Sequence, residues 1–232
     1  MNDLSLLDIF SFGWFAACWF GYNYFSEVSS RSGNLLAVMN EYRRYWMHQM
    51  LARDNRMVDA SLIGNLLRSI SFFASTSIFI VLGLITLLKY RTEATGILTA
   101  IPYATPASPI LWEGKIFLLV ILFVYTFFKY TWSLRQYNYA CVLVGAAPPA
   151  GQRNAYYDEY ADNAARLVGN AAKHFNVAMR AYYFGLAALA WFVNSWLFVL
   201  ATTWVVMVIY RREFRSHALH YLTNPAIFQE MK

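Results

Sequence analysis

The chain has 232 residues, of which 59% are hydrophobic, 19% are aromatic and only 14% are charged. Soluble domains average roughly half apolar and about a quarter charged residues, so this composition excludes a water-soluble domain of this size, and also a disordered or fibrous chain. The 19 Lys and Arg residues exceed the 13 Asp and Glu residues, which gives a net charge of +6. Because the basic residues lie beside apolar runs, the charge indicates contact with membrane lipids, and no nucleic-acid partner is expected.

Four apolar segments are predicted to cross a membrane, since a crossing takes roughly 20 helical residues. They cover residues 4–25, 68–88, 112–133 and 181–210. The third continues as a polar, aromatic stretch that either leaves the membrane as a straight helix or lines a polar interior. The fourth contains Asn194 and Ser195 at its middle and is too short for two full crossings, so it must tilt, kink or fold back. We predict an all-α integral membrane protein with about four transmembrane spans, in a single domain over residues 1–232.

The distribution of basic residues predicts which connections face the cytoplasm. The connection between the first two spans and the one between the last two each carry six Lys or Arg residues, against three between the second and third spans. Both long connections are therefore expected inside, with the amino terminus outside. Four crossings would also place the carboxyl terminus outside, although Arg211, Arg212 and Arg215 directly follow the fourth span. A re-entrant fourth segment would bring this basic tail inside.

The first long connection is predicted to form an amphipathic helix over residues 34–57. One face carries apolar residues at steps of three and four, namely Leu35, Met39, Tyr42, Trp46 and Met50. This pattern fits an interfacial helix on the inner leaflet, and it fits equally well a helix packed against another helix in a cytoplasmic layer. Amphipathicity alone does not distinguish the two.

The second long connection is predicted to form an amphipathic helix over residues 155–180. Its apolar stripe includes the small residues Ala164 and Ala171, together with Leu167 and Phe175. Because small residues allow close approach of two backbones, this stripe favours packing of helix on helix.

The search for catalytic, metal-binding and cofactor-binding residues identifies no site. None of the four histidines lies in a predicted span, and only His217 and His220 have a spacing compatible with a metal pair, without a nearby Asp, Glu or Cys. No cofactor is predicted, whereas bound lipid is expected. Ionisable and polar residues that continue the third span are the candidates for a polar path or a partner contact: Lys129, Arg135, Gln136 and Asn138.

Three stretches of the chain resemble one membrane family. They are RRYWMHQMLARDNRMVDASLIGNLLRSISFFASTSIFIVLG (43–83), KYTWSLRQYNYACVLVGAAP (129–148) and the segment 179–216. The chain is similar here to family 599 of the domains of unknown function, found in bacteria and plants. The resemblance implies a four-span helical protein of a bacterial inner membrane, without an established activity. The family's recurring motifs include Trp46, Arg53, Asp54, Arg56, Asp59, Phe72, Phe73, Arg135, Tyr137 and Asn138.

The small-residue stripe, the many aromatic residues and the lack of reactive clusters favour a non-enzymatic membrane protein that acts through assembly. We expect a homo-oligomer or a subunit of a larger membrane complex, in contact with membrane lipids. A pore or transport path is one form of this hypothesis. The alternative from another class is a cofactor-binding membrane oxidoreductase or a lipid-modifying enzyme.

Overall fold

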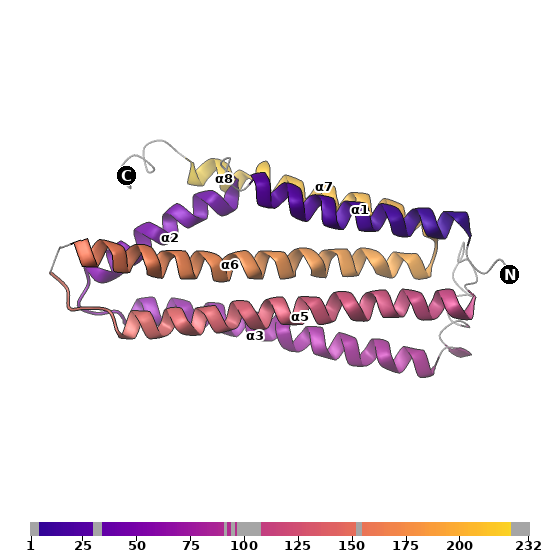
Figure 1. Cartoon of the computed structure of the whole chain (residues 1–232), viewed down its shortest axis with the longest axis horizontal. Helices are drawn as coiled ribbons and strands as arrows, with labels where there is room; N and C mark the ends of the chain where they lie inside the picture. Colours follow the sequence, from indigo (N-terminus) through magenta and orange to yellow (C-terminus); the bar gives the residue numbers. More distant parts are fainter. Residues whose placement is uncertain are drawn as a thin grey trace. The chain divides into compact units, whose positions relative to one another are not determined.

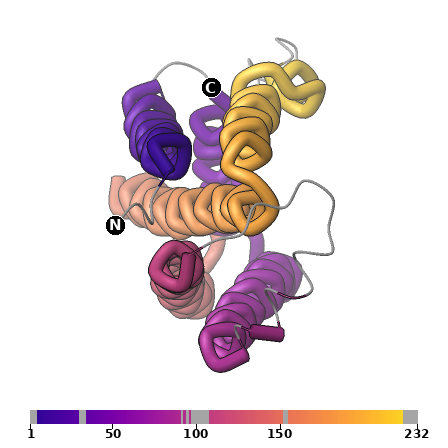
Figure 2. Tube along the Cα trace, turned by 90° about the vertical axis from the view of Figure 1, so that its right-hand side faces the viewer, coloured from indigo at the N-terminus to yellow at the C-terminus, as the bar shows by residue number. Residues whose placement is uncertain are grey.

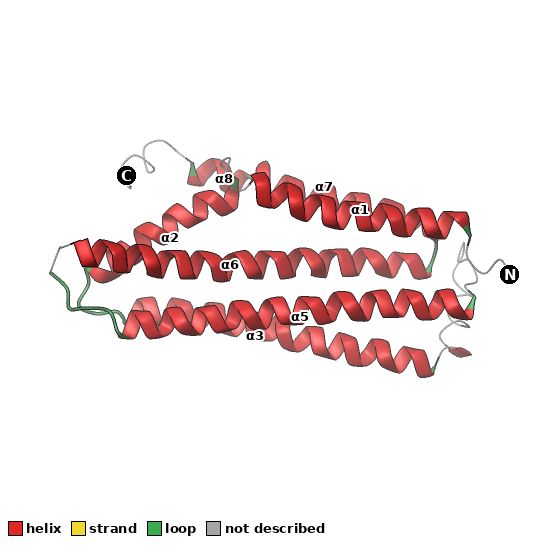
Figure 3. Cartoon of the chain, viewed as in Figure 1, coloured by secondary structure: helices red, strands yellow, loops and turns green. Residues whose placement is uncertain are grey.

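The computed structural model describes residues 5–29, 34–90, 92–93, 96, 108–151 and 155–223, and the regular structure in these residues is helical (Figure 3). The principal elements, in chain order, are α1 (Leu6–Ser29), α2 (Leu35–Leu51), α3 (Met57–Lys89), α5 (Pro109–Gly145), α6 (Ala155–Leu189), the 3-10 turn η1 (Ala190–Phe192), α7 (Ser195–Phe214) and α8 (His217–Leu222). The expected all-α class is confirmed.

Two helices among the described residues, α3 and α5, are long and apolar enough to cross a membrane, as judged by length and composition. They contain the predicted second and third spans. Each is longer than its predicted span, because α3 begins at Met57 and α5 continues to Gly145. The polar continuation of the third span is therefore part of the same helix. The first and fourth predicted spans stay predictions.

Contacts between residues divide the chain into two compact units, and the single domain over residues 1–232 stays a prediction. Unit 1 comprises Met1–Val28, Ser75–Phe128 and Val177–Tyr210. Unit 2 comprises Ser29–Ala74, Lys129–Asn176 and Arg211–Lys232. Helices α3, α5 and α6 each pass from one unit into the other, so each contributes an apolar segment to unit 1 and a more polar segment to unit 2.

Unit 1 has an aromatic core built around its segment of α6. In two perpendicular views this segment lies between α1 and α5 (Figures 1 and 2). Phe184 of α6 meets Phe15 of α1 edge to face, with ring centroids 5.8 Å apart, and both side chains are buried. On its α5 side, Gly185 faces the ring of Phe123, where an added Cβ would lie only 2.9 Å from the ring. The glycine thus permits the close contact of α6 with α5.

The predicted fourth span, 181–210, which the sequence left open as a tilted, kinked or folded-back segment, is interrupted between two helices. Helix α6 ends at Leu189, η1 follows, and α7 begins at Ser195 and runs back antiparallel to α6 (Figure 1). The side chain of Asn194 explains the restart, because its Oδ1 accepts a hydrogen bond of 2.8 Å from the backbone N–H of Trp196. The amide thereby satisfies a backbone donor in the first turn of α7.

Unit 2 packs α2 and α8 with the polar segments of α3, α5 and α6. Helix α2 begins after Asn34, whose Oδ1 accepts a hydrogen bond of 2.9 Å from the N–H of Ala37. The helix ends at Leu51 and is therefore shorter than the predicted helix over residues 34–57. A tight corner over residues 52–56 separates it from α3. The predicted helix 155–180 is the first part of α6.

Candidate functional site

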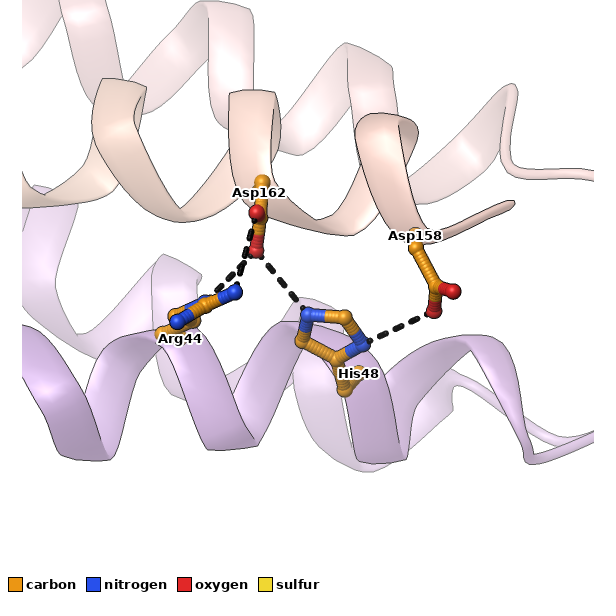
Figure 4. A network of polar contacts seen from close by, with 4 residues as sticks. All are labelled: Arg44, His48, Asp158 and Asp162. Carbon is orange, nitrogen blue, oxygen red and sulfur yellow. Dashed lines mark hydrogen bonds and ion pairs between the residues drawn. The ribbon is translucent and has the colours of Figure 1, made fainter. Parts of the chain in front are cut away.

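A charged network joins α2 to the first part of α6 in unit 2 (Figure 4). Arg44 donates two hydrogen bonds to Asp162, from Nε to Oδ1 at 2.7 Å and from Nη2 to Oδ2 at 3.2 Å. His48 Nε2 lies 3.0 Å from the same Oδ1, and His48 Nδ1 lies 3.6 Å from Asp158 Oδ1. Each helix contributes residues four positions apart, which share one helix face. The network fixes the register of α2 on α6.

The network influences the proton affinity of its central carboxylate. Hydrogen bonds from Arg44, and then from His48, hold the pKa of Asp162 below its usual value. The same contact raises the pKa of the Arg44 guanidinium. Asp162 is therefore ionised throughout the physiological pH range, and Arg44 is held in a fixed orientation.

A polar groove of about 510 Å³, here called the α2–α6 groove, lies beside this ion pair. Its lining residues are Leu36, Asn40, Glu41 and Arg44 from α2, and Asp162, Ala165, Arg166, Gly169, Asn170 and Lys173 from α6. At Gly169 an added Cβ would lie 2.9 Å from Asn40 Oδ1, so the glycine allows close approach of the two helices. Among the described residues, this groove combines a concave shape with several charged groups, and we take it as the candidate functional site.

A second polar cluster closes the corner between α2 and α3. The carboxylate of Asp59 is fully buried in the first turn of α3, and its Oδ1 accepts hydrogen bonds from Trp46 Nε1 at 2.6 Å and from Arg53 Nη1 at 2.9 Å. Its Oδ2 is buried without a hydrogen-bond partner in the described part of the chain. The negative charge is favoured near a helix N-terminus. Three of the family-motif residues, Trp46, Arg53 and Asp59, thus hold the corner between α2 and α3 together.

Arg56 fastens the same corner to the chain that follows α5. Its Nη1 donates to the carbonyl oxygen of Ala147 at 2.7 Å, and its Nη2 donates to that of Pro148 at 2.5 Å. A planar guanidinium suits two adjacent carbonyl acceptors. Asp54, between these motif positions, is exposed.

Unit 1 contains its own buried polar cluster around Asp8. Oδ1 of this carboxylate accepts hydrogen bonds from Trp191 Nε1 at 3.0 Å and from Ser195 Oγ at 2.5 Å. Buried Lys115 donates to the backbone oxygen of Trp191 at 2.7 Å. The cluster ties α1 and α5 to the reversal between α6 and α7. Its contacts are internal, and we read it as the stabilising element of that reversal.

The residues predicted to line a polar path do not lie together on one face of α5. Arg135 and Asn138 are exposed, and Arg135 Nε donates to Tyr139 Oη at 2.6 Å. Gln136 is buried and Lys129 is half-buried. The structure thus divides the four residues between the outside of unit 2 and its interior.

The two histidines considered for metal binding, His217 and His220, are both exposed on α8. Among the residues that the structure describes, no three His, Cys, Asp or Glu side chains gather into a group that could hold a metal ion. Neither histidine contributes to the candidate site.

The predicted apolar face of α2 has protein partners in unit 2. Met50 is fully buried, whereas Leu35, Met39, Tyr42 and Trp46 are half-buried. The hydroxyl of Tyr42 donates to the carbonyl oxygen of Leu222 in α8 at 3.1 Å. Helix α2 therefore packs against α8 as well as α6.

The small-residue stripe of α6 is in close contact with α5. Ala164 and Ala171 are buried, Leu167 is half-buried, and Ser133 Oγ of α5 donates to the backbone oxygen of Ala171 at 2.7 Å. The stripe is part of the interior of unit 2.

The aromatic motif residue Phe73 lies at the junction of α3, α5 and α6 in unit 2. The ring of Phe73 stacks on that of Tyr130 at 5.7 Å and meets that of Phe175 at 6.2 Å. Tyr137 is buried, whereas the neighbouring Phe72 is largely exposed. These residues explain packing and add no chemistry to the groove.

Sequence reasoning missed the groove because its residues come from two distant segments. The available signal was complementary spacing: Arg44 and His48 are four apart, as are Asp158 and Asp162. In the sequence, Asp158 and Asp162 are already explained as favourable charges near a helix N-terminus. Their pairing with Arg44 and His48 was therefore not predicted.

Comparison with known proteins gives one match. The family described as "Protein of unknown function, DUF599" matches residues 10–218, which is most of the chain. No curated protein and no solved structure matches. The family description assigns no activity, so a functional proposal has to rest on the geometry of the two units.

Proposed function

We propose a role in membrane assembly for this chain, which belongs to the DUF599 family of proteins of unknown function. In this proposal unit 1 is embedded in the bilayer, unit 2 forms a cytoplasmic helical layer, and copies of the chain associate through unit 2. The protein is non-enzymatic, and its partners are membrane lipids and further copies of itself.

The distribution of charge supports the membrane placement. Among the 15 Lys and Arg residues that the structure describes, Lys89, Lys115 and Arg180 belong to unit 1 and the other 12 belong to unit 2. An excess of basic residues marks the cytoplasmic side of a membrane protein. The division into units, which follows from contacts between residues, thus coincides with a division of charge.

The helix break at residues 190–194 favours five crossings instead of the four expected from hydropathy. Helix α7 has 20 residues, enough for about 30 Å of helix, and the preceding crossing is the second half of α6. The crossings would be α1, α3, α5, α6 and α7. An odd number of crossings places the basic residues in the last turn of α7 and directly after it in the cytoplasm with the rest of unit 2, in agreement with the positive-inside rule.

One observation carries the assembly role: the part of α3 in unit 2 has an apolar face that the chain leaves exposed. Val58, Leu62 and Leu66 follow one another at helical spacing, with exposed fractions of 65%, 47% and 38%. They precede the predicted span, which begins at residue 68. A contiguous apolar face outside the hydrocarbon layer indicates a protein interface. A second copy of the chain, presenting the same face, would cover it symmetrically.

Cysteine labelling tests the topology. Both native cysteines, Cys18 and Cys141, are first replaced by Ser, and single cysteines are introduced at the exposed positions Ser5, Ala52 and Ala218. A membrane-impermeant maleimide applied to intact bacterial cells should label Ser5→Cys alone, whereas all three variants react after lysis. Labelling of Ala218→Cys in intact cells would show an even number of crossings.

Cross-linking tests the assembly. In the same cysteine-free background, Leu62→Cys should form a disulfide-linked dimer in oxidised membranes, and Ala52→Cys, on the neighbouring corner, should remain monomeric. Native mass spectrometry of the wild-type protein should show a defined oligomer, which Leu62→Glu converts to monomer. A wild-type monomer that retains a haem, quinone or metal would contradict the proposal and favour the oxidoreductase alternative.

A further inference from the structure

We propose that the α2–α6 groove binds the phosphate group of a ligand whose net charge is negative. The chemistry of the groove walls carries this inference. Under the topology proposed above, the phosphate belongs to the headgroup of an anionic lipid of the inner leaflet. That assignment of the source rests on the proposed function, whereas the phosphate chemistry does not.

The floor of the groove is built from small residues of α6. Ala165 and Gly169 are buried, and at Gly169 the side chain of Asn40 occupies the space that a Cβ would need. The volume of the groove, about 510 Å³, is within the range of small-molecule sites. The groove can therefore hold a phosphate ester without a rearrangement of the helices.

The wall formed by α6 offers donors for an anion. Arg166, Asn170 and Lys173 are spaced four and three residues apart, so they share one face of the helix. Arg166 and Asn170 are exposed, and neither side chain makes a hydrogen bond or ion pair within the described part of the chain. A guanidinium binds two phosphate oxygens at once, and an amide adds a neutral donor.

The opposite wall sets the charge of the groove. Arg44 is held by Asp162, which compensates its charge, and Glu41 on the same helix also acts on Arg44. Glu41 and Asp162 both act on Arg44, and the cations on the α6 wall are Arg166 and Lys173. A neutral or cationic ligand would gain little from this arrangement.

The position of Lys173 in the chain favours a lipid source. Lys173 precedes Val177, the first α6 residue of unit 1, by only four residues. Four residues correspond to about 6 Å along a helix, so the Lys173 end of the groove would lie at the depth of the headgroups. Basic residues at that depth attract anionic lipids.

The test compares two double variants that remove the same charge from unit 2. One is Arg166→Gln/Lys173→Gln in the groove, and the other is Arg211→Gln/Arg215→Gln, a matched control outside it. Each full-length protein is exchanged into equimolar phosphatidylglycerol and phosphatidylcholine, and the retained lipid is identified by native mass spectrometry. Thermal unfolding in phosphatidylcholine nanodiscs with added inorganic phosphate tests the soluble source.

We expect the wild type and the control to retain phosphatidylglycerol about tenfold over phosphatidylcholine, because the choline cation cancels the phosphate charge of phosphatidylcholine whereas phosphatidylglycerol keeps a net negative charge. The groove variant should lose this preference, and the charge-retaining Arg166→Lys/Lys173→Arg should recover part of it. Stabilisation by inorganic phosphate in the wild type but not the groove variant, without lipid selectivity, would keep the phosphate site and assign a soluble ligand. Equal retention by both double variants, or no response to either probe, would overturn the proposal. The cysteine-labelling pattern is read independently, so a failed topology is distinguishable from an empty groove.

Discussion

In unit 1 the helices meet mainly through aromatic rings, whereas in unit 2 they also meet through charged side chains. Phe15 lies against Phe184 and Phe198, with ring centroids 5.8 and 5.2 Å apart. In unit 2, Asp162 binds Arg44 and His48, and Asp59 binds Arg53. Since α3, α5 and α6 contribute to both units, the same helices change their packing chemistry along their length. The two units thus differ in the chemistry of their helix contacts.

Because of this difference, we expect the effect of substitutions on the free energy of unfolding to differ between the units. Rings packed in unit 1 resist added volume, because a close-packed interior has no free space. The charged contacts in unit 2 should differ in their contribution to stability. Removing the cation beside a buried carboxylate should destabilise the protein strongly, whereas breaking an exposed ion pair should cost little. The four predictions below test this ranking.

The largest effect is expected where unit 2 buries a charge. Arg53→Met should lower the free energy of unfolding by about 2 to 4 kcal/mol, because it leaves the Asp59 carboxylate buried without its cation. Chemical unfolding in mild detergent, followed by tryptophan fluorescence, measures the loss. Adding Asp59→Asn should restore part of it, and Asp54→Asn at the exposed neighbour should change nothing. A loss that persists in full in the double variant would show that Arg53 acts through packing alone.

A matched pair of glycines compares the units directly. Gly185→Ala in unit 1 should cost about 1 to 3 kcal/mol, because its Cβ would press on the buried ring of Phe123 at 2.9 Å. Gly169→Ala in unit 2 should be nearly neutral, because Asn40 can rotate away and alanine favours the helix by about 1 kcal/mol. Thermal unfolding of both variants gives the ranking. Equal losses at the two positions would contradict the contrast between the units.

The exposed ion pair of unit 2 should contribute less. Arg44→Gln should lower the free energy of unfolding by about 0.2 to 1 kcal/mol, because 57% of the Arg44 side chain is exposed. High salt should reduce the difference between wild type and variant. Because the pKa of Asp162 is lowered by this pair, the contribution is present at neutral pH and lost only as the pH falls below about 3.9. Denaturation curves of wild type and variant at two salt concentrations measure this difference. A difference that does not change with salt would contradict the prediction.

The smallest expected effect is a pH dependence at His174 in unit 2. Burial, followed by the charges of Lys129 and Lys173, lowers the pKa of this imidazole. The unfolded chain therefore binds the proton more readily, so acidification below about pH 6.5 should destabilise the protein. His174→Gln should show a smaller decrease in melting temperature between pH 7.5 and pH 5.5. An unchanged pH dependence in this variant would assign the effect to another group.

The helices themselves could be predicted from the sequence, because apolar residues at helical spacing and long apolar runs are local signals. The amphipathic pattern around Trp46 and Met50 predicted α2 but left its partner open, and the structure supplies α6 and α8. The restart of α7 has a local cause in Asn194. The reversal also depends on Asp8, which is separated from Ser195 by 187 residues, and no local pattern identifies such a contact.

The candidate groove could not be predicted from the sequence either, because it is formed by residues that are far apart in the chain. Its two walls come from α2 and α6, and the contact of Arg44 with Asp162 joins residues 118 positions apart. The spacing within each helix is visible in the sequence, but the close contact of Asn40 with Gly169 appears only when the two backbones are in place.

The hydrogen bonds of Arg56 have a consequence for the biosynthesis of this chain. The carbonyl oxygen of Ala147 lies 91 residues further along the sequence than the guanidinium that binds it. At roughly 5 to 20 residues per second, a ribosome needs about 5 to 18 seconds to synthesise that interval. During this time the corner between α2 and α3 can already have formed, while Arg56 remains hydrated. The arrival of residues 147 and 148 then joins the first half of the nascent chain to the second.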